Sequence, residues 1–577
     1  MENKEIADMF NEIAAMLSID ESPNTKFEIR AYQKAALTIG TLQEAIEDIY
    51  KEGGLDALME LPGIGKGLAA KIEEYIKTGK IKKYDELKKK YPIDIKQLTS
   101  IAGVGAKKAA KLYKELKVKD ISTLKKAIDQ HRIAKLEGFG ARSEEAMGKG
   151  ITLLEASKGR LLLGDALPMA EEIVSQLKKS KLVDRVVIAG SARRMRETVG
   201  DLDILALSDQ GDEVIDLFTK LPEVSNIVVK GPTKATVWLK MGISCDLRVI
   251  APESFGAALQ YFTGNKDHNI QVRKIAISKG YKLNEYGLFD KKNKIIPTKN
   301  EEEIYGKLGM QYMPPEMRES RGEVKLAQEH RIPELVEMGD IKGDMHLHSN
   351  ESTDAASTIE EMAQAAIEAK LEYFASTNHT KSLRIVNGMD DKKFAEFFKR
   401  VDKLNDSLDG KLRILKGAEV DILKDGSLDL SAETLKGMDY ALGAVHSSFN
   451  MTEEEMTSRI TKAMDSGLIK ALAHPTGREI GIREAYPLNM EKVFEAAERN
   501  NVALEINSQP LRLDLNDTNV MKASQYKLKF SIGSDSHITS QIGFLKYGVA
   551  TARRGWLTKD RIINAMPLSE ITKFLTR

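Results

Sequence analysis

The spacing of apolar residues along the chain changes twice and predicts three kinds of architecture. Over residues 1–150 apolar positions recur about every 3.6 residues, with breaks at glycine, which predicts a series of short helices. β-branched apolar runs between residues 183 and 251 predict strands. From Asp340 onward short apolar strands alternate with helical stretches, which predicts a β/α barrel or a layered α/β domain. Because one core rarely serves more than about 250–300 residues, a chain of 577 residues is expected to be multidomain.

Composition narrows the class of protein. With 42% hydrophobic and 30% charged residues the chain has an ordinary globular balance. The single cysteine, Cys245, excludes an internal disulfide framework and a zinc site built from cysteines. The N-terminus lacks the basic start and apolar run of a signal peptide, and no apolar stretch is long enough to span a membrane. A cytoplasmic protein is therefore expected.

Lysines are concentrated in the helical N-terminal part. Between Lys66 and Lys126, 18 lysines face 7 acidic residues. Such a surplus is typical either of a polyanion partner or of a solvated helix face. Charge alone does not separate these two interpretations.

A short pattern, Gly-x-Gly followed by a lysine-rich helix, occurs twice in this region, and a degenerate third copy covers residues 136–146. Backbone N–H groups in such a turn can approach a phosphate at the start of the second helix, so they would bind the DNA backbone rather than its bases. Two copies favour DNA binding over a plain helix connection, and they resemble helix-hairpin-helix motifs of DNA repair enzymes and polymerases. The residues expected to contact DNA are Gly63, Gly65, Lys66, Gly103, Gly105, Lys107 and Lys108.

Two aspartates lie inside the apolar run DLDILALS. On a strand, Asp201 and Asp203 point to one face, where carboxylates can jointly hold Mg²⁺. Carboxylates within an apolar run need metals or partners, which argues against two plain surface acids. Asp246, in ISCDLRVIA, would complete a two-metal site for phosphoryl transfer. Upstream, Gly190 and Ser191 begin a turn whose donors can hold a triphosphate, and the order of GS and DxD is similar to the nucleotidyltransferase superfamily signature.

The segment YFTGNKDHNIQVR, residues 261–273, closely resembles family X DNA polymerases, the polymerase-beta-like group. The resemblance implies that Tyr261 and Phe262 lie against the sugar of the incoming deoxynucleotide and help to exclude a 2′-hydroxyl. It implies that Asn269 and Arg273 contact the nascent base pair and the template minor groove. Further nucleotide-binding positions implied by it are Gly190, Ser191, Arg194, Gly200 and Gly264, with Asp201, Asp203 and Asp246 as ligands of Mg²⁺ or Mn²⁺.

One departure from the family pattern concerns the primer end. The family often has an arginine two residues before the third aspartate, where this chain has Ser244, so primer positioning is expected to differ. His268 is interpreted as a surface or template-side residue.

Residues 26–81 resemble the small N-terminal domain of the family, which binds the 5′-phosphate of a gap. Lys71 matches the lysine that, in some members, excises deoxyribose phosphate through a Schiff base. A lysine can do this only as a neutral amine, which crowding by other cationic groups favours. Two roles for Lys71 stay open, lyase nucleophile or phosphate contact only.

Six of the nine histidines fall between His346 and His537, and nearly all of them end a predicted strand. In a β/α barrel the carboxyl ends of all strands meet on one face. Single histidines at strand ends are usually satisfied core residues, but five strands that deliver them to one rim predict a metal site. Imidazole and carboxylate ligands without thiolate suit Mn²⁺, Zn²⁺ or Fe²⁺ better than Ca²⁺ or Mg²⁺.

The order HxH, D, H, E, H, H, DxH resembles that of the polymerase and histidinol phosphatase (PHP) domain, which holds up to three metal ions. The matching ligands are His346, His348, Asp354, His379, Glu419, His446, His474, Asp535 and His537. Asp354 lies one residue farther from the HxH pair than in the usual pattern. Glu505 and Asn507 also resemble a family stretch but receive no ligand role. The complete ligand set predicts an active phosphoesterase.

The chain is thus identified as similar to bacterial and archaeal family X DNA polymerases with a C-terminal PHP domain. The implied fold is an α-helical helix-hairpin-helix region, an α+β nucleotidyltransferase palm with a mixed subdomain, and a distorted β/α barrel. The expected boundaries are 1–86 for the 5′-phosphate or lyase-like domain, 87–150 for the second hairpin, 151–252 for the palm, 253–318 for the nascent-base-pair subdomain, 319–339 for a linker and 340–577 for the PHP domain.

The implied activity is gap filling in base excision repair on gapped or primer-template DNA with dNTPs, joined to metal-dependent 3′–5′ exonuclease or abasic-site endonuclease activity. No apolar oligomerisation segment stands out, so a monomer is expected. Two alternatives are weighed. A template-free nucleotidyltransferase acting on RNA would share GS and DxD but would not need the hairpins or YFTG. A non-catalytic DNA-end-binding scaffold would keep the hairpins without the carboxylates and histidines.

Overall fold

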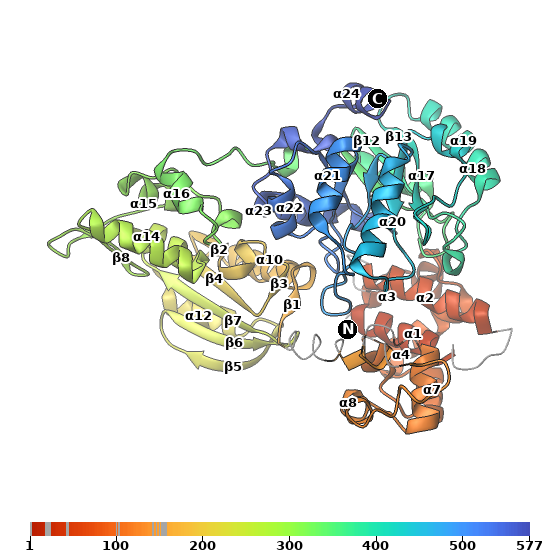
Figure 1. Cartoon of the computed structure of the whole chain (residues 1–577). Helices are drawn as coiled ribbons and strands as arrows, with labels where there is room; N and C mark the ends of the chain where they lie inside the picture. The colour runs from red at the N-terminus through yellow and green to blue at the C-terminus, as the bar shows by residue number, and fades with distance from the viewer. Residues whose placement is uncertain are drawn as a thin grey trace.

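The computed structural model describes residues 3–17, 25–41, 46–99, 101, 104, 106–140, 143–145, 147–148, 151 and 159–576. Along the chain these form a helical N-terminal region, a central sheet, a lobe of mixed helices and short strands, and a C-terminal barrel. In Figure 1 the N-terminal helices lie beneath the barrel, and the central sheet and mixed lobe lie to one side of it. No helix among the described segments is long and apolar enough to cross a membrane.

The helical N-terminal region has two separate hydrophobic cores. The first gathers apolar residues from Ile6 to Ile95, and the second those from Leu98 to Ile151. The helices are α1 Asn3–Leu17, α2 Thr25–Thr41, α3 Ile46–Glu60, α4 Lys66–Thr78, α5 Lys82–Lys90, α6 Ile95–Thr99, α7 Ala106–Leu116 and α8 Ile121–Asp129. In the first glycine hairpin, residues 61–65 connect α3 to α4.

The central sheet has five strands in the order β2-β4-β7-β6-β5, with β4 and β7 parallel and the other neighbours antiparallel. Alternate residues of β4, such as Leu202 and Ile204, are buried, as a half-buried strand requires. The predicted strands are confirmed, and β5 is an additional edge strand whose apolar residues are exposed. The elements are β1 Leu161–Leu162, α10 Leu163–Lys179, β2 Arg185–Ile188, α11 Gly190–Arg193, β3 Thr198–Val199, β4 Asp201–Leu207, α12 Gly211–Thr219, β5 Val224–Lys230, β6 Lys234–Leu239 and β7 Ser244–Ile250.

The mixed lobe follows directly and extends through the segment predicted as a linker, residues 319–339. Val324 and Ala327 of that segment pack in the same core as Ile304 and Leu288. The elements of the lobe are η1 Pro252–Ser254, α13 Phe255–Thr263, α14 Lys266–Ser278, β8 Lys282–Asn284, β9 Gly287–Phe289, β10 Ile295–Ile296, α15 Glu301–Lys307, η2 Pro315–Met317, α16 Glu323–Gln328 and η3 Met338–Asp340.

The C-terminal domain is a barrel of seven parallel strands in sequence order, β11 to β17, which confirms the predicted β/α alternation. Two backbone hydrogen bonds close it: Asp535 N–H donates to His346 O at 2.8 Å, and His348 N–H donates to Ser536 O at 2.8 Å. The strands are β11 Gly343–Leu347, β12 Tyr373–Ser376, β13 Arg413–Asp421, β14 Tyr440–Ala444, β15 Ala471–Leu472, β16 Ala503–Asn507 and β17 Phe530–Gly533. The helices are α17 Ile359–Glu368, α18 Asp391–Ser407, α19 Ala432–Lys436, α20 Glu453–Asp465, α21 Met490–Asn500, α22 Asp517–Ala523, α23 Leu545–Arg554 and α24 Leu568–Leu575, with short 3₁₀ turns η4 Arg384–Val386, η5 Thr539–Phe544, η6 Lys559–Arg561 and η7 Ile563–Ala565.

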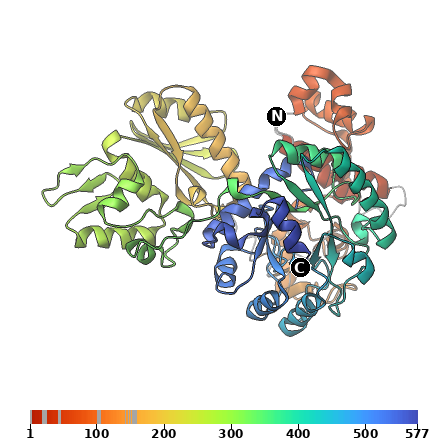
Figure 2. The ribbon, with the colours of Figure 1, turned by 90° about the horizontal axis from the view of Figure 1, so that it is seen from above.

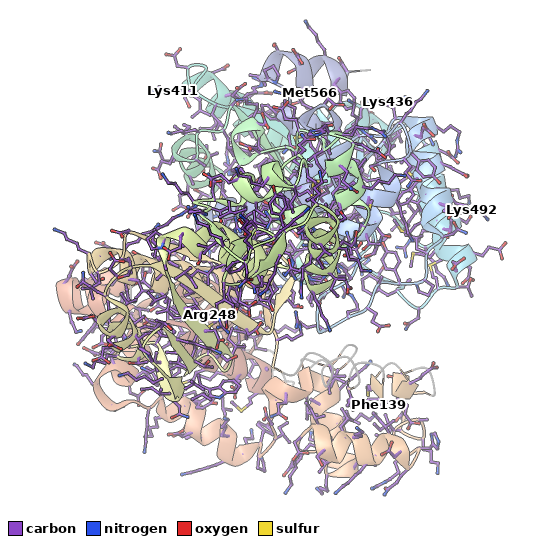
Figure 3. The ribbon with its side chains drawn as sticks, turned by 90° about the vertical axis from the view of Figure 1, so that its left-hand side faces the viewer. Phe139, Arg248, Lys411, Lys436, Lys492 and Met566 are labelled. Carbon is purple, nitrogen blue, oxygen red and sulfur yellow. The ribbon has the colours of Figure 1, made fainter. Side chains whose placement is uncertain are left out.

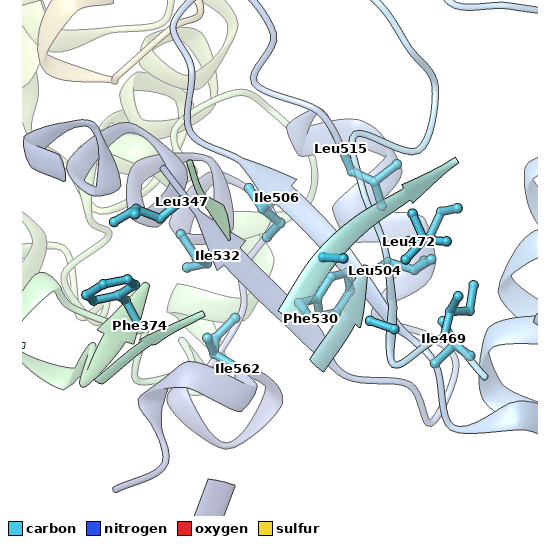
Figure 4. Packing of buried hydrophobic residues seen from close by; sticks show 14 of the residues in the cluster. Leu347, Phe374, Ile469, Leu472, Leu504, Ile506, Leu515, Phe530, Ile532 and Ile562 are labelled. Carbon is cyan, nitrogen blue, oxygen red and sulfur yellow. The ribbon is translucent and has the colours of Figure 1, made fainter. Parts of the chain in front are cut away.

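The barrel strands are buried, as parallel strands covered by helices are, except that Arg413 at the start of β13 is exposed and Lys416 is half-buried. Figure 4 shows part of their apolar packing, in which Leu504, Ile506 and Phe530 lie together. This core fixes the strand ends from which the histidines project.

The central sheet and the barrel share apolar packing. Tyr547 of α23 and Leu513 of the barrel belong to the buried cluster that contains Leu202 and Ile204 of the central sheet. Figure 2 shows the sheet and mixed lobe against the C-terminal, blue part of the barrel. Because this contact is buried and apolar, the two parts form a joined unit.

Candidate active sites

The predicted carboxylates meet on the central sheet. Asp203 of β4 and Asp246 of β7 are register partners on neighbouring parallel strands, and Asp201 is paired with Ser244. All three point to the face opposite Leu202, Ile204, Cys245 and Leu247, which are buried. The structure therefore brings the three acids together as predicted.

The environment of the three acids is that of a cation site. Burial and the charges of Asp201 and Asp246 raise the pKa of Asp203 to about 7. A divalent ion would remove this repulsion between carboxylates. The backbone also approaches closely: Gly190 has φ +61°, and a Cβ atom there would lie 2.2 Å from Asp203 Oδ2. The residues present therefore fit a divalent ion.

A cavity of about 470 Å³ opens beside these aspartates. The predicted nucleotide-binding residues that line it are Gly190, Ser191, Arg194, Tyr261, Phe262, Gly264, Asn269 and Arg273. Gly200 does not line it and instead packs near Arg160, whose Nη1 would lie 3.0 Å from an added Cβ. The cavity has room for a small phosphorylated ligand that faces the carboxylates.

Hydrogen bonds fix the walls of this cavity. Arg194 Nη1 donates to Thr263 O at 2.5 Å, which ties the turn after β2 to the end of α13. The Asn269 amide donates to Tyr261 O at 2.7 Å and accepts from Gln260 at 2.8 Å. Asn269 thus also holds the backbone of the aromatic pair.

His268 is not a surface residue, and its interpretation as one is wrong. Its ring is fully buried, with Nδ1 2.8 Å from Glu323 Oε1 and Nε2 3.0 Å from the Tyr305 hydroxyl. Glu323 comes from α16, in the segment predicted as a linker. Because this partner is 55 residues away, the local pattern around His268 could not reveal its burial.

Two cationic side chains that were not predicted from the sequence lie beside Asp246. Lys234 Nζ lies 3.3 Å from Asp246 Oδ2, and Arg248 Nη2 lies 3.9 Å from the same oxygen. The Arg248 guanidinium also lies over the Phe262 ring, 4.5 Å from its centre. Arg248 follows Asp246 by two residues on the same strand face, so the period of the strand was a signal for it. Arg248 thus places an arginine on β7, the strand on which Ser244 replaces the arginine that the family often has.

The first glycine hairpin forms a second large cavity, of about 800 Å³, with its lysines around the rim. Gly63, Gly65, Lys66 and Lys71 line it, together with residues of the barrel loop after His348. Gly63 has φ +78°, and a Cβ there would lie 2.6 Å from Lys34, so the turn requires glycine. Lys71 Nζ donates to Gly67 O at 3.2 Å and lies 5.8 Å from the centre of the Tyr32 ring.

The second hairpin is only partly described. Gly103, Gly105 and the side chain of Lys107 lie outside the described residues. Lys108 lies in the first turn of α7, with its Nζ 5.8 Å from the Phe139 ring centre. Figure 3 shows Phe139 far from Arg248 of the central sheet, in a different part of the molecule.

The barrel histidines converge as their positions at strand ends predict. His346 and His348 approach to 3.0 Å between Nε2 atoms, and His348 stacks on His537 with ring centres 4.2 Å apart. Three overlapping groups have ligand atoms close enough for a shared ion: His348, His379 and His537; His346, His348 and Asp535; and His379, Glu419 and His446.

The remaining predicted ligands join the same cluster. His474 Nε2 lies 2.7 Å from Glu419 Oε1, and His446 Nε2 lies 3.1 Å from it. Asp354 Oδ2 lies 3.1 Å from His379 Nε2 and 3.3 Å from His537 Nε2. The longer spacing before Asp354 therefore does not keep it from the cluster.

The chemistry of this cluster also fits metal ions. Burial and the neighbouring rings lower the pKa of His348 to about 3, which leaves the neutral imidazole that metals bind. Burial alone would raise the pKa of Glu419, but the charges of His446, His379 and His346 hold it well below its usual range. Among the described residues, His348 Nδ1, Asp354 Oδ1 and Glu419 Oε2 are buried without a hydrogen bond. Such atoms need a ligand or an ion.

Three further residues orient the predicted ligands. Glu505 Oε1 lies 2.7 Å from His346 Nδ1, and its Oε2 accepts from the backbone N–H of His474 at 2.6 Å. Asp421 Oδ1 lies 3.0 Å from His446 Nδ1, and the Asn507 amide donates to Asp535 Oδ2 at 3.1 Å. The sequence held a signal for them: Glu419 and Asp421, like Glu505 and Asn507, are two residues apart at the end of a strand and therefore point to the same side.

Comparison with protein families finds models that match separate parts of the chain. Residues 1–81 match a helix-hairpin-helix domain, and residues 55–119 and 95–147 match a tandem of this type. Residues 258–319 match the DNA polymerase beta thumb, and residues 344–509 match the PHP domain.

Individual proteins extend these matches. A DNA polymerase/3′-5′ exonuclease PolX from Bacillus subtilis is 37% identical over 580 aligned positions that cover 100% of both chains. Probable phosphatases match a smaller share of the chain: one from Thermoanaerobacter is 27% identical over 38% of this chain and 89% of its own length. Another, from Acetivibrio thermocellus, is 29% identical over 35% of this chain and 81% of its own length.

Proposed function

The chain belongs to the family X DNA polymerases with a C-terminal PHP domain, and we propose that it fills short gaps in DNA during repair. It is a DNA polymerase with 3′–5′ exonuclease activity, and both activities depend on divalent metal ions. The observation that carries the proposal is that two clusters of side chains suited to divalent ions lie in two different cores. The carboxylates belong to the central sheet, and the histidines belong to the barrel.

We assign polymerisation to the central sheet. Asp201, Asp203 and Asp246 would hold Mg²⁺ or Mn²⁺, which supplies stabilisation of negative charge on the attacking and leaving oxygens. Ser191 and Arg194 would hold the triphosphate in the cavity beside them. Tyr261 and Phe262 would pack against the sugar and leave no room for a 2′-hydroxyl.

Primer positioning is proposed to use the cations found beside the third aspartate. Lys234 and Arg248 lie on the same side of the sheet as Asp246, within 3.3 Å and 3.9 Å of its carboxylate. They would orient Asp246 and attract the phosphate of the primer terminus. This arrangement would compensate for Ser244.

We assign 3′–5′ degradation to the barrel rim, where the nine predicted ligands would hold up to three ions. Mn²⁺, Zn²⁺ or Fe²⁺ fit imidazole and carboxylate donors, and the ions supply a hydrolytic water of lowered pKa. Glu505, Asp421 and Asn507 would keep the rings and Asp535 in the required orientation. The same site would also act on blocked 3′ ends or abasic sites.

The glycine hairpins are proposed to hold the gapped DNA by its backbone. The lysines around Gly63 and Gly65 suit a terminal 5′-phosphate. Lys71 is proposed as the lyase nucleophile, since its Nζ lies at this cavity beside Tyr32. The proposal further includes a monomer in the cytoplasm. A template-free nucleotidyltransferase or a scaffold is not favoured, because the full-length relative is named as polymerase and exonuclease.

One experiment tests this division of labour. A gapped, 5′-phosphorylated DNA is incubated with Mn²⁺ and with or without dNTPs, and both extension and degradation are followed. A variant of the carboxylates should lose only extension, and a variant of the histidines should lose only degradation.

A further inference from the structure

Glu319 follows η2 in the mixed lobe and holds two walls of the nucleotide cavity. Its Oε1 accepts from Arg194 Nε at 3.1 Å, and its Oε2 accepts from the Asn265 amide at 3.1 Å. Both partners line the cavity. The carboxylate is only 7% exposed, so these bonds are protected from water.

A barrel side chain completes this arrangement. Arg554, the last residue of α23, donates from Nη1 to Glu319 Oε1 at 3.0 Å and to the backbone carbonyl of Arg194 at 2.6 Å. Its Nη2 donates to Asp517 Oδ2 at 2.6 Å, at the start of α22. The guanidinium is 4% exposed. Arg554 therefore touches Arg194 directly and also through Glu319.

Four arginines, Arg194, Arg196, Arg321 and Arg554, share the two carboxylates of this network, Glu319 and Asp517. Arg321 Nη2 also donates to Asp517 at 3.0 Å, and Arg196 Nη1 lies 3.6 Å from Glu319 Oε2. Burial raises the pKa of Glu319, but the charges of Arg554, Arg194 and Arg196 outweigh it and lower the pKa. Without Arg554, Glu319 would lose one of its bonds, and the carbonyl of Arg194 would lose its donor.

The barrel cannot easily move away from this site. Tyr547, on the same helix as Arg554, is buried in the core of the central sheet. The α23 helix also packs on η2, two residues before Glu319. Figure 1 shows α22 and α23 beside α10, the helix that packs on β2 and β4 of the central sheet.

We propose that Arg554, contributed by the PHP barrel, is a positioning residue of the polymerase nucleotide site. It fixes the backbone and guanidinium of Arg194 in the orientation that receives the triphosphate. The barrel is thus a structural part of the nucleotide pocket as well as the carrier of the second active site. The inference rests on the proposed contact between Arg194 and the triphosphate.

The test is steady-state extension of gapped DNA by full-length Arg554→Gln. The KM for dNTP should rise about tenfold, the loss expected for one charge-assisted hydrogen bond. The kcat should stay within about twofold, and the rate of 3′–5′ degradation should not change. Arg554→Lys keeps the positive charge but loses the planar guanidinium, which donates to several acceptors at once. Its KM for dNTP should therefore lie between those of the wild type and Arg554→Gln.

Arg553→Gln is the matched control. Arg553 precedes Arg554 in α23. Its side chain donates to Glu316 Oε1 at 2.8 Å and to Val336 O at 3.0 Å, and neither partner lines the nucleotide cavity. Its KM for dNTP should equal that of the wild type. A double-mutant cycle with Glu319→Gln should be strongly non-additive, because both changes break one network.

Each outcome is decisive. Arg194→Gln is the reference: if it leaves the KM for dNTP unchanged, the proposed triphosphate contact itself is wrong. If Arg194→Gln raises the KM and folded Arg554→Gln does not, the role of Arg554 is wrong. Equal loss of extension and degradation in Arg554→Gln, with a lowered thermal midpoint, would show a merely structural role. Should that variant not fold, an unchanged KM in Arg554→Lys would overturn the proposal.

Discussion

Glu505 Oε1 lies 2.7 Å from Nδ1 of His346. A carboxylate on β16 therefore orients a predicted metal ligand on β11, across the point where the barrel closes. The same carboxylate also accepts from the backbone N–H of His474. Glu505 is fully buried and belongs to none of the three groups of ligand atoms. Its contacts make it a support for the ligands.

Glu505→Gln should therefore weaken metal binding without removing a ligand. Loss of such an outer partner typically costs about 10- to 100-fold in metal affinity. The Mn²⁺ concentration for half-maximal degradation should rise by this factor, while extension stays unchanged. Glu498→Gln is the control, because Glu498 is a surface acceptor for the Lys527 N–H. Full metal retention after dialysis in Glu505→Gln would contradict this role.

Gly190→Ala should abolish dNTP incorporation. The added Cβ would lie 2.2 Å from Asp203 Oδ2, so the carboxylate must move. Gly242→Ala separates this clash from backbone strain, because Gly242, in the turn between β6 and β7, has φ +90° but nothing within 4 Å of an added Cβ. Gly242→Ala should lose about 1–2 kcal/mol of stability and keep its extension rate. Near wild-type extension by Gly190→Ala would rule out Asp203 as an essential ligand.

Glu301→Gln should destabilise the mixed lobe. Glu301 is buried and bonds both Arg318, which is fully buried, and Arg193, at 2.6 Å. Removal of its charge leaves Arg318 uncompensated, which typically costs about 3–5 kcal/mol. Glu329→Gln, in a partly exposed pair with Arg331, should cost less than about 1 kcal/mol. Thermal unfolding monitored by hydrogen exchange in α13 and α15 measures the loss of stability in each variant. Equal midpoints for the two variants would contradict a larger loss in Glu301→Gln.

The same carboxylate gives a pH dependence with a definite sign. Burial raises the pKa of Glu301, but Arg318 and Arg193 lower it to about 2. A lowered pKa contributes stability above the unfolded value of about 4.3. This contribution should fall as the pH drops from about 4.5 towards 2. In Glu301→Gln the stability of the lobe should lose this part of its acid dependence, and an unchanged acid profile would show that Glu301 does not carry it.

Lys71→Ala tests the lyase proposal. With a deoxyribose-phosphate end on the DNA, borohydride should trap a covalent adduct in the wild type and none in this variant. Lys77→Ala is the control, because Lys77 lies on the same helix but pairs with Glu73 at 2.8 Å. An adduct that persists in Lys71→Ala would assign the chemistry to another amine. No adduct in the wild type would leave Lys71 as a phosphate contact.

The sequence predicted those parts of the sites that depend on local periodicity. Asp201 and Asp203 share a strand face, and His346 and His348 end a strand, because alternation fixes where such side chains point. The barrel followed from the regular alternation of strands and helices. These features need no knowledge of distant contacts.

Features that depend on tertiary packing were not predictable in this way. His268 is buried because Glu323 lies 55 residues later in the chain, and Arg554 reaches Arg194 across 360 residues. The polar residues of segment 319–339 suggest a linker, but two of them have buried partners: Glu319 bonds Arg554, and Glu323 bonds His268. No spacing rule connects such pairs.

The most direct test of two separate active sites is one gapped, 5′-phosphorylated DNA assayed for extension and degradation with His346→Ala/His348→Ala and with Asp203→Asn. The histidine variant should contain less metal and lose 3′–5′ degradation but extend the primer in the presence of dNTPs. Asp203→Asn should bind and degrade the DNA but not extend it, and in the wild type Mn²⁺ should support degradation better than Ca²⁺. A histidine variant that degrades DNA as fast as the wild type, or an Asp203→Asn variant that still extends it, would contradict the account.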